Sequence, residues 1–390
     1  MARSPLQGMV MASTGPAGFA ARVGDIEPFR VVAVLERATR LAAAGEDIVH
    51  MAAGEPDFVT AGPIVEAGRA ALARGETHYS QAAGIPPLRE AIAAHYAATY
   101  GLEIGPERIM VTPGASGALL LIAALLVEPG KGMLMTDPGY PCNRHFMRLV
   151  EGRGQLVPVT AADNYQLNEK LVAEHWRDNT IGALVASPAN PTGTALSRAD
   201  LASLSGAVRA RGGHLLVDEI YHGLCYDGEA PSVLEVDDDA FVINSFSKYF
   251  GMTGWRLGWL VAPAAAVVEM EKMAQNLFIS MSTMAQHAAL AGFEPATRDI
   301  LEERRDVFRQ RRDFLLPAVR DLGFAVPCAP QGAFYIYADA SRFTADSEAF
   351  CLRLLEEHGV ALTPGLDFGR YRAGEHLRFS YTTSLERLEL

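Results

Sequence analysis

The chain has 390 residues, of which 49% are hydrophobic and 21% charged, so it can bury a large core and has the length of two or three ordinary domains. Its formal net charge of -12 and its pI of about 5.4, without any basic run, exclude nucleic acid as an expected partner. A ligand with a phosphate group stays compatible with an acidic protein, because local groups decide where an anion binds.

Cysteine spacing and hydropathy exclude several further classes of protein. The four cysteines are far apart and form no C-x-x-C pair, so they indicate neither a zinc site nor a disulfide framework and favour a reducing cytoplasm. The first twenty residues lack the basic start and apolar core of a signal peptide. The longest apolar run, residues 118–127, is about half the ~20 residues of a membrane span, so we expect a buried helix and no membrane partner.

The N-terminal part of the chain predicts an arm, one helix and one short strand. Residues 1–25 are expected to form the arm, because they begin with Gly, Pro, Ser and Thr without periodicity. Apolar residues at helical spacing predict a helix over residues 27–44, which ends at Gly45. A short apolar strand over residues 48–52 then runs into an irregular loop with the sequence G-E-P-D-F, which begins at Gly54.

Strands and helices alternate from about residue 50 to residue 290. Strands are predicted at residues 108–112, 132–136, 182–186, 214–217, 241–245 and 257–262. Helices are predicted at residues 88–100, 117–126, 197–211 and 264–286, the last with a break near 276–282. This alternation predicts an α/β domain with a mostly parallel sheet, which binds ligands beyond the carboxyl ends of its strands.

The C-terminal part predicts a second, smaller α/β body. A long helix over residues 294–322 is followed by a strand at 334–338, a helix at 347–358 and further strand-like segments at 360–365 and 377–380. We therefore expect a large domain over residues 50–292. Residues 26–49 and 293–390 are expected to form the small domain together.

One short segment, residues 244–259, combines Lys248 with Ser245, Ser247 and Arg256. A lysine amine forms a Schiff base with an aldehyde only when it is partly deprotonated, and burial or a nearby cation such as Arg256 lowers its pKa. Hydroxyl groups and an arginine are suitable partners for a phosphate monoester. These residues predict covalently held pyridoxal 5'-phosphate (PLP), although this segment alone would also fit an exposed lysine in a glycine-rich turn.

The pattern S-F-S-K-x(7)-R-x-G-W, which starts at Ser245, resembles the cofactor-lysine segment of the class I/II PLP-dependent aminotransferases, the aspartate aminotransferase superfamily. The resemblance runs from about Val49 to Arg378 through several motifs in the family's order. It implies the α/β fold of PLP-dependent transferases of fold type I, with a large domain on a mostly parallel sheet and a smaller α/β domain. It also implies a homodimer with shared active sites.

The same resemblance implies contacts to the cofactor ring. Tyr140, in D-P-G-Y-P, would stack on the pyridine ring, while Asn190, in N-P-T-G, and Tyr221 would hydrogen-bond its phenolate oxygen. Asp218 would pair with the protonated pyridine nitrogen, which keeps the ring able to accept carbanion electrons.

Further motifs imply contacts to the cofactor phosphate and to the substrate. Ala115 and Ser116 follow a Pro-Gly turn at an expected helix start, where free N–H groups suit a phosphate. Tyr79 would reach the phosphate of the partner subunit's cofactor. Gly54 and Asn190 would lie near the substrate, and Arg378 would bind its α-carboxylate through a planar fork.

The expected activity is amino-group transfer from an L-amino acid to a 2-oxo acid by a ping-pong route, in which Lys248 acts as general base and acid. The apolar segment 276–280, together with the lack of a second placed arginine, favours neutral or aromatic donors. Two other activities share these motifs: a PLP-dependent carbon–sulfur β-lyase, and the PLP-binding regulatory domain of a transcription factor. The second would need a preceding DNA-binding domain, for which the sequence offers no basic helical pair.

Overall fold

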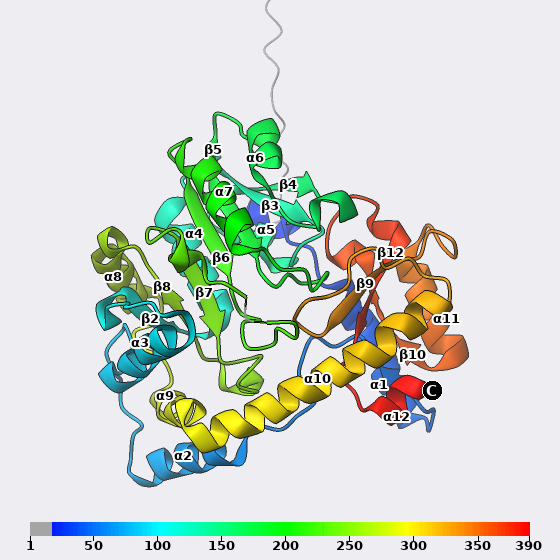
Figure 1. The fold of residues 1–390 in the computed structure, drawn as a ribbon, viewed down its shortest axis with the longest axis horizontal. Coiled ribbons are helices and arrows are strands. Elements are labelled where there is room, and N and C mark those ends of the chain that lie inside the picture. Colours follow the sequence, from blue (N-terminus) through cyan, green and yellow to red (C-terminus); the bar gives the residue numbers. More distant parts are fainter. Residues whose placement is uncertain (1–17, 229) are drawn as a thin grey trace, which may run out of the picture.

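The computed structural model describes residues 18–228 and 230–390, and its main layer is a seven-stranded sheet in the order β2-β8-β7-β6-β5-β3-β4 (Figure 1). The strands are β2 (Ile109–Thr112), β3 (Gly132–Asp137), β4 (Arg153–Pro158), β5 (Thr180–Ala186), β6 (His214–Asp218), β7 (Phe241–Ser245) and β8 (Gly258–Val261). Only β8 runs antiparallel to its neighbours in this sheet, and the pairs among β3 to β7 are parallel. The predicted mostly parallel α/β fold is confirmed.

Both faces of this sheet are buried, which explains the continuous apolar runs of its strands. In β6, Leu215 and Val217 belong to the hydrophobic cluster on one face, whereas Leu216 belongs to the cluster on the other. The helices of this large body are α2 (Gly62–Ala73), α3 (Pro86–Tyr100), α4 (Gly114–Leu126), α5 (Cys142–Leu149), α6 (Glu169–His175), α7 (Arg198–Arg209), α8 (Val267–Leu277) and α9 (Thr283–Leu290). The break predicted near residues 276–282 within the helical segment 264–286 is confirmed, since α8 ends at Leu277 and α9 begins at Thr283.

A smaller body contains elements from both ends of the chain. It contains α1 (Arg30–Ala43), β1 (Val49–His50), α10 (Pro295–Asp321), β9 (Tyr335–Asp339), α11 (Ser347–His358), β10 (Val360–Ala361), β11 (Thr363–Pro364), β12 (His376–Ser380) and α12 (Leu385–Glu389). Strand β1 pairs with β10, and β11, β12 and β9 form an antiparallel sheet. Helix α10 runs from beside α2 and α9 to the smaller body (Figure 1).

The elements that follow β3 in the large body, α5, β4 and α6, were not expected from the sequence. Strand β4 lies at the edge of the sheet and carries Arg153, Gly154 and Gln155, so it lacks an apolar pattern. Helices α5 and α6 have eight and seven residues, too short for a clear period. Short and half-exposed elements of this kind are formed by packing against the sheet rather than by local pattern.

The N-terminal helix starts three residues later than expected, at Arg30, and Glu27 and Pro28 stay outside it. Residues 1–17 of the predicted arm lie outside the described residues. The end of the arm forms a short helical turn, Ala21–Asp25, which is attached to α5 by an ion pair of 2.7 Å between Arg148 and Asp25. The domain boundaries at residues 50 and 292 stay a prediction.

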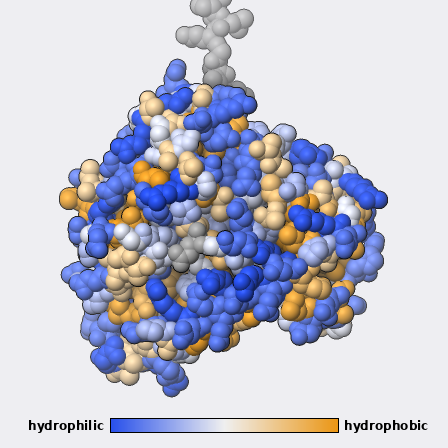
Figure 2. Space-filling view, viewed as in Figure 1, coloured by the Kyte–Doolittle hydropathy of each residue, from blue (hydrophilic) through white to orange (hydrophobic). Residues whose placement is uncertain are grey.

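Hydrophilic residues cover most of the face in Figure 2, and apolar residues form only small groups on it. None of the helices in the described ranges is long and apolar enough to cross a membrane. Within the same ranges, no group of three or more His, Cys, Asp or Glu side chains could hold a metal ion. The four cysteines, Cys142, Cys225, Cys328 and Cys351, are not joined by disulfides.

Candidate active site

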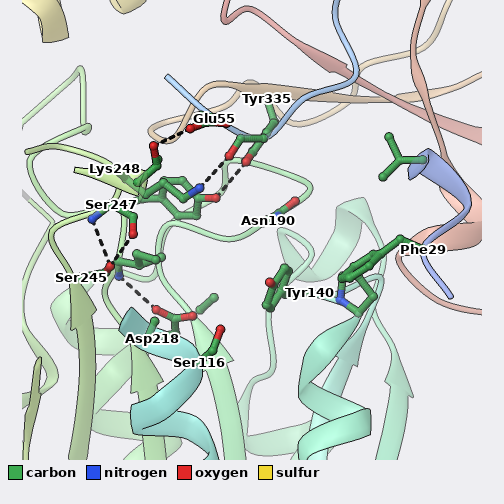
Figure 3. A pocket seen from close by; sticks show the side chains of 18 of the residues that line it. Phe29, Glu55, Ser116, Tyr140, Asn190, Asp218, Ser245, Ser247, Lys248 and Tyr335 are labelled. Carbon is green, nitrogen blue, oxygen red and sulfur yellow. Dashed lines mark hydrogen bonds between the residues drawn. The ribbon is translucent and has the colours of Figure 1, made fainter. Parts of the chain in front are cut away.

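A cavity of about 510 Å³ lies where β5, β6 and β7 end, between the large sheet and the smaller body (Figure 3). Its lining contains every predicted site residue except Tyr79: Gly54, Ala115, Ser116, Tyr140, Asn190, Asp218, Tyr221, Ser245, Ser247, Lys248, Arg256 and Arg378. Residues that are more than 300 positions apart in the chain therefore meet at one site. This is the location that the parallel topology predicts.

Lys248 follows the end of β7 by three residues and points into the cavity (Figure 3). Its Nζ donates a hydrogen bond of 2.6 Å to the carbonyl oxygen of Gly54. Burial first, and then the charges of Arg378 and Arg256, lower the pKa of Lys248 to about 8, although Glu55 and Asp218 oppose them. The sequence had indicated Arg256 as the cation that lowers this pKa, but in the structure Arg378 lowers the pKa of Lys248 more than Arg256 does.

One end of the cavity gathers groups that favour an anion. The hydroxyls of Ser245 and Ser247 lie 3.0 Å apart, and the backbone N–H of Ser247 donates to Ser245 Oγ over 3.0 Å. The guanidinium of Arg256 lies against the start of α4, where a Cβ on Gly114 would come within 2.8 Å of Arg256 Nη2. Glycine at position 114, with φ of +69°, permits this close approach. Hydroxyls, a guanidinium and a helix N-terminus together suit a phosphate group.

The cavity also contains a buried carboxylate, that of Asp218. Asp218 is the last residue of β6, and it accepts a hydrogen bond of 3.1 Å from the backbone N–H of Ile220. Burial raises the pKa of Asp218 to about 7, and the backbone hydrogen bond and Lys248 oppose this shift. No cationic side chain of the described residues forms an ion pair with it. A buried carboxylate in this state favours a ligand that brings a positive charge.

Arg378 crosses the cavity from β12 and is held on several sides. Its Nη1 donates to Asn190 Oδ1 over 3.0 Å, and its Nη2 donates to the carbonyl of Ala52 over 2.8 Å and to Thr363 Oγ1 over 3.2 Å. The guanidinium carbon lies 4.2 Å from the ring centre of Tyr335 and 4.9 Å from that of Phe368. The planar guanidinium is therefore fixed in orientation before any ligand binds.

Several lining residues were missed by the sequence analysis. Tyr335 is the main one, because its hydroxyl lies 2.9 Å from the hydroxyl of Tyr221 and its ring stacks on Arg378. It stands in a strand of aromatic and aliphatic residues that carries no polar pattern, so nothing local distinguished it from the core. Thr363, Phe368 and the residues at the start of α1 were also missed.

Tyr79 does not line the cavity of its own chain. It lies between α2 and α3 and is 80% exposed. Its neighbour His78 is fixed, since the carbonyl of His78 accepts a hydrogen bond of 2.6 Å from Thr283 Oγ1. An exposed tyrosine on a fixed loop is compatible with contact to a second subunit, and this role stays a prediction.

Comparison with known proteins identifies the family. The model of the family "Aminotransferase class I and II" matches residues 46–390. The chain is 36% identical to the valine–pyruvate aminotransferase of Mycobacterium tuberculosis, over 91% of this chain and 92% of that one. It is 35% identical to the aspartate/prephenate aminotransferase of Thermus thermophilus, over 95% of this chain and 96% of that one.

Solved structures agree with the sequence comparisons. An aminotransferase from Mycobacterium tuberculosis superposes with a TM-score of 0.92 at 36% identity, covering 96% of this chain and 97% of that one. The chain belongs to the class I and II aminotransferases, a family of PLP-dependent enzymes of fold type I whose substrates are amino acids and oxo acids.

Proposed function

We propose that the protein holds PLP on Lys248 and transfers the amino group of neutral L-amino acids to a 2-oxo acid by a ping-pong route. One observation supports this most strongly. A lysine with a lowered pKa lines the same cavity as a group of anion-binding residues and a buried carboxylate that forms no ion pair among the described residues. These three features match the aldehyde, the phosphate and the pyridine nitrogen of PLP.

Each part of the cofactor has residues that would hold it. Ser245, Ser247 and Arg256, with the start of α4 at Ala115 and Ser116, would bind the phosphate. Asp218 would pair with the pyridine nitrogen, and Tyr140 would stack on the ring, with Asn190 and Tyr221 at the phenolate oxygen. When bound, PLP supplies an electron sink for the electrons that remain when the substrate's α-carbon loses its proton.

Lys248 is the proposed general base and acid. Its amine would remove the proton from the substrate's α-carbon and return it to the carbon that had carried the aldehyde. Proton transfer is most efficient when the pKa of the group lies near the working pH, which a value of about 8 satisfies. Arg378 would hold the α-carboxylate at the same time and so fix the α-carbon beside the amine.

The charges around the cavity favour donors with an uncharged side chain. Apart from Lys248, its cationic lining residues among those described are Arg256 and Arg378, which the cofactor phosphate and the α-carboxylate would use. Glu55 and Asp367 add negative charge, and Phe29 and Val32 add an apolar wall. The segment 276–280, on which the sequence-based preference relied, does not line the cavity, so the wall comes from α1 instead.

A donor screen tests this preference. Valine, leucine and phenylalanine are expected to give kcat/KM values at least about tenfold above those of aspartate and glutamate, because a side-chain carboxylate would be buried without a cation. The half-reaction is followed by the change in cofactor absorption, with pyruvate and 2-oxoglutarate compared as acceptors. A protein that reacts only with aspartate and glutamate contradicts the preference. Release of ammonia and pyruvate from cystathionine would favour the β-lyase instead.

The pH dependence of cofactor capture tests the state of Lys248. A lysine with a pKa of about 8 has roughly a tenth of its amine unprotonated at pH 7, against less than about 0.1% for an ordinary lysine. The rate at which the cofactor-free protein captures PLP is therefore expected to rise with pH and reach half its maximum near pH 8. Stopped-flow absorbance from pH 6 to 10 measures this. A midpoint above pH 9.5 would show that the amine is not perturbed.

We also propose a homodimer in which Tyr79 reaches the phosphate site of the other subunit. Its exposure of 80% next to a fixed loop supports this arrangement, as do the exposed apolar residues Val59, Leu72 and Ile279. Sedimentation of the PLP-loaded protein should give twice the chain mass of 41.9 kDa. A single-chain mass under these conditions would rule out shared sites.

A further inference from the structure

The residues after β11, 365–371, lie between α1, Arg378 and the large sheet, and we call them the coupling segment. Asp367, within this segment, is buried and uses both carboxylate oxygens on the start of α1. Its Oδ1 accepts from the backbone N–H of Arg30 over 2.6 Å, and its Oδ2 accepts from that of Val31 over 2.9 Å. These N–H groups lie in the first turn of the helix, where backbone N–H groups have no acceptor within the helix itself.

Helix α1 has no cap of its own. Its N-cap residue is Phe29, whose side chain accepts no hydrogen bond, and its first turn contains no acidic residue. Asp367 therefore performs from more than 300 residues away the function that a local Ser, Asp or Asn usually performs. Its negative charge at the helix N-terminus is also favourable to the helix dipole.

The helix end that Asp367 holds forms a wall of the cavity. Phe29, Val31 and Val32 line the cavity, and Phe29 and Val32 are 38% and 45% exposed toward open space. Figure 3 shows Phe29 near Tyr140, on the side of the cavity away from Lys248. This is where a donor side chain would extend when its α-carbon lies beside Lys248.

The next residue along the coupling segment contacts Arg378. The ring centre of Phe368 lies 4.9 Å from the guanidinium carbon, and the carbonyl of Phe368 accepts a hydrogen bond of 2.8 Å from Gly139 of the large sheet body. Asp137, at the end of β3, accepts from the backbone N–H groups of Arg370 over 2.9 Å and Tyr371 over 3.1 Å. The coupling segment is therefore attached to the large body. Two of its adjacent residues make the other contacts: Asp367 binds the start of α1, and Phe368 packs against Arg378.

We propose that Asp367 is a positioning residue that sets the distance between Arg378 and the wall formed by Phe29 and Val32, and thereby selects donors by side-chain length. The inference rests on the proposed function, because it takes the α-carboxylate to bind at Arg378. A donor held there meets the wall only if its side chain is long enough. On this proposal alanine, with a single methyl group, is expected to stop short of the wall, whereas leucine and phenylalanine are expected to contact it.

The test compares Asp367→Ala with Asp346→Ala. Asp346 caps another helix of the smaller body, since its side chain accepts from the N–H of Ala349 over 3.1 Å, but it is exposed and does not line the cavity. Loss of the cap in Asp367→Ala is expected to raise the KM of leucine and phenylalanine about tenfold, with less than about a twofold change in kcat and in the KM of alanine. Asp346→Ala is expected to leave all of these values unchanged.

Hydrogen exchange gives a readout that does not depend on turnover. The amides of Arg30 and Val31 are expected to exchange faster in Asp367→Ala than in the wild type, and not in Asp346→Ala. Asp367→Asn keeps one acceptor oxygen. It should give a KM for leucine and phenylalanine, and an exchange rate at Arg30 and Val31, between those of the wild type and Asp367→Ala. This variant replaces Asp367→Ala in the test if the alanine variant does not fold.

Two results would overturn the inference. One is an equal rise in KM for alanine and leucine, which would assign Asp367 to general stability. The other is faster exchange at α1 with unchanged KM for leucine and phenylalanine. A wild-type protein that reacts only with aspartate and glutamate contradicts the proposed function instead, and this is seen before any variant is compared.

Discussion

Replacing Lys248 with alanine is expected to lower the rate of amino-group transfer by more than about 10³-fold while the protein stays folded. The change removes the only lysine amine among the described residues that line the cavity, so both the covalent attachment and the proton transfer are lost. Stability should not fall, because burial already disfavours the charge on Lys248, as its pKa of about 8 indicates. Single-turnover kinetics with excess protein measures the loss.

The chain offers a simple control for this change. It contains four lysines, Lys131, Lys170, Lys248 and Lys272, and Lys272 is exposed on α8 far from the cavity lining. Lys272→Ala is expected to retain full activity. Borohydride reduction of the PLP-loaded wild type should label the peptide that contains Lys248 and no other. A label on a different lysine, or normal turnover in Lys248→Ala, would remove Lys248 from the proposed role.

Replacing Arg378 with lysine is expected to raise the KM of every amino-acid donor roughly 10²-fold, with a much smaller effect on the binding of PLP. The guanidinium donates in three directions, to Asn190, Ala52 and Thr363, and lies between two aromatic rings. A lysine keeps the positive charge, but it has no planar fork and cannot bind a carboxylate bidentately. Steady-state kinetics with valine and phenylalanine measures the change.

The matched control is Arg372→Lys. Arg372 belongs to the same body and forms ion pairs with Asp339 and Glu375 at 3.0 and 2.7 Å, but it is exposed and does not line the cavity. Its conservative replacement should leave KM unchanged. If Arg378→Lys left the KM of all donors unchanged but weakened PLP binding, Arg378 would belong to the cofactor site rather than to the substrate site.

Elements with a long or strongly apolar pattern could be predicted from the sequence. Strand β7 was predicted with the observed bounds, and α8 and α9 were separated at the observed break, because Asn276 to Ser282 interrupt the helical pattern. Strand β4 could not be predicted, because its first half, Arg153 to Gln155, has no apolar residue and its pairing with β3 is decided by the neighbouring strand. Pairing across the sheet is a long-range interaction that leaves little trace in a short edge strand.

The candidate site was predictable wherever its residues stand in local motifs. Lys248 with its serines, Asn190 in N-P-T-G and Asp218 at the end of a buried strand could each be located from neighbouring residues. Tyr335 and Phe368 could not, since an aromatic residue in an apolar strand or loop is more often part of the core. Their proximity to Arg378 depends on how β9, β12 and the coupling segment pack together.

By itself, the sequence determined the class of fold, the lysine, the parts of the site that bind a phosphate and a cationic ring, and the arginine for a carboxylate. These features depend on local pattern and on chemical groups that each motif carries. Only the tertiary structure decided that Arg378 rather than Arg256 contributes more to the low pKa of Lys248, and that Asp367 caps a helix more than 300 residues away. It also decided that α1 forms the apolar wall. Such features depend on distances between segments remote in the chain, which packing sets and local sequence does not encode.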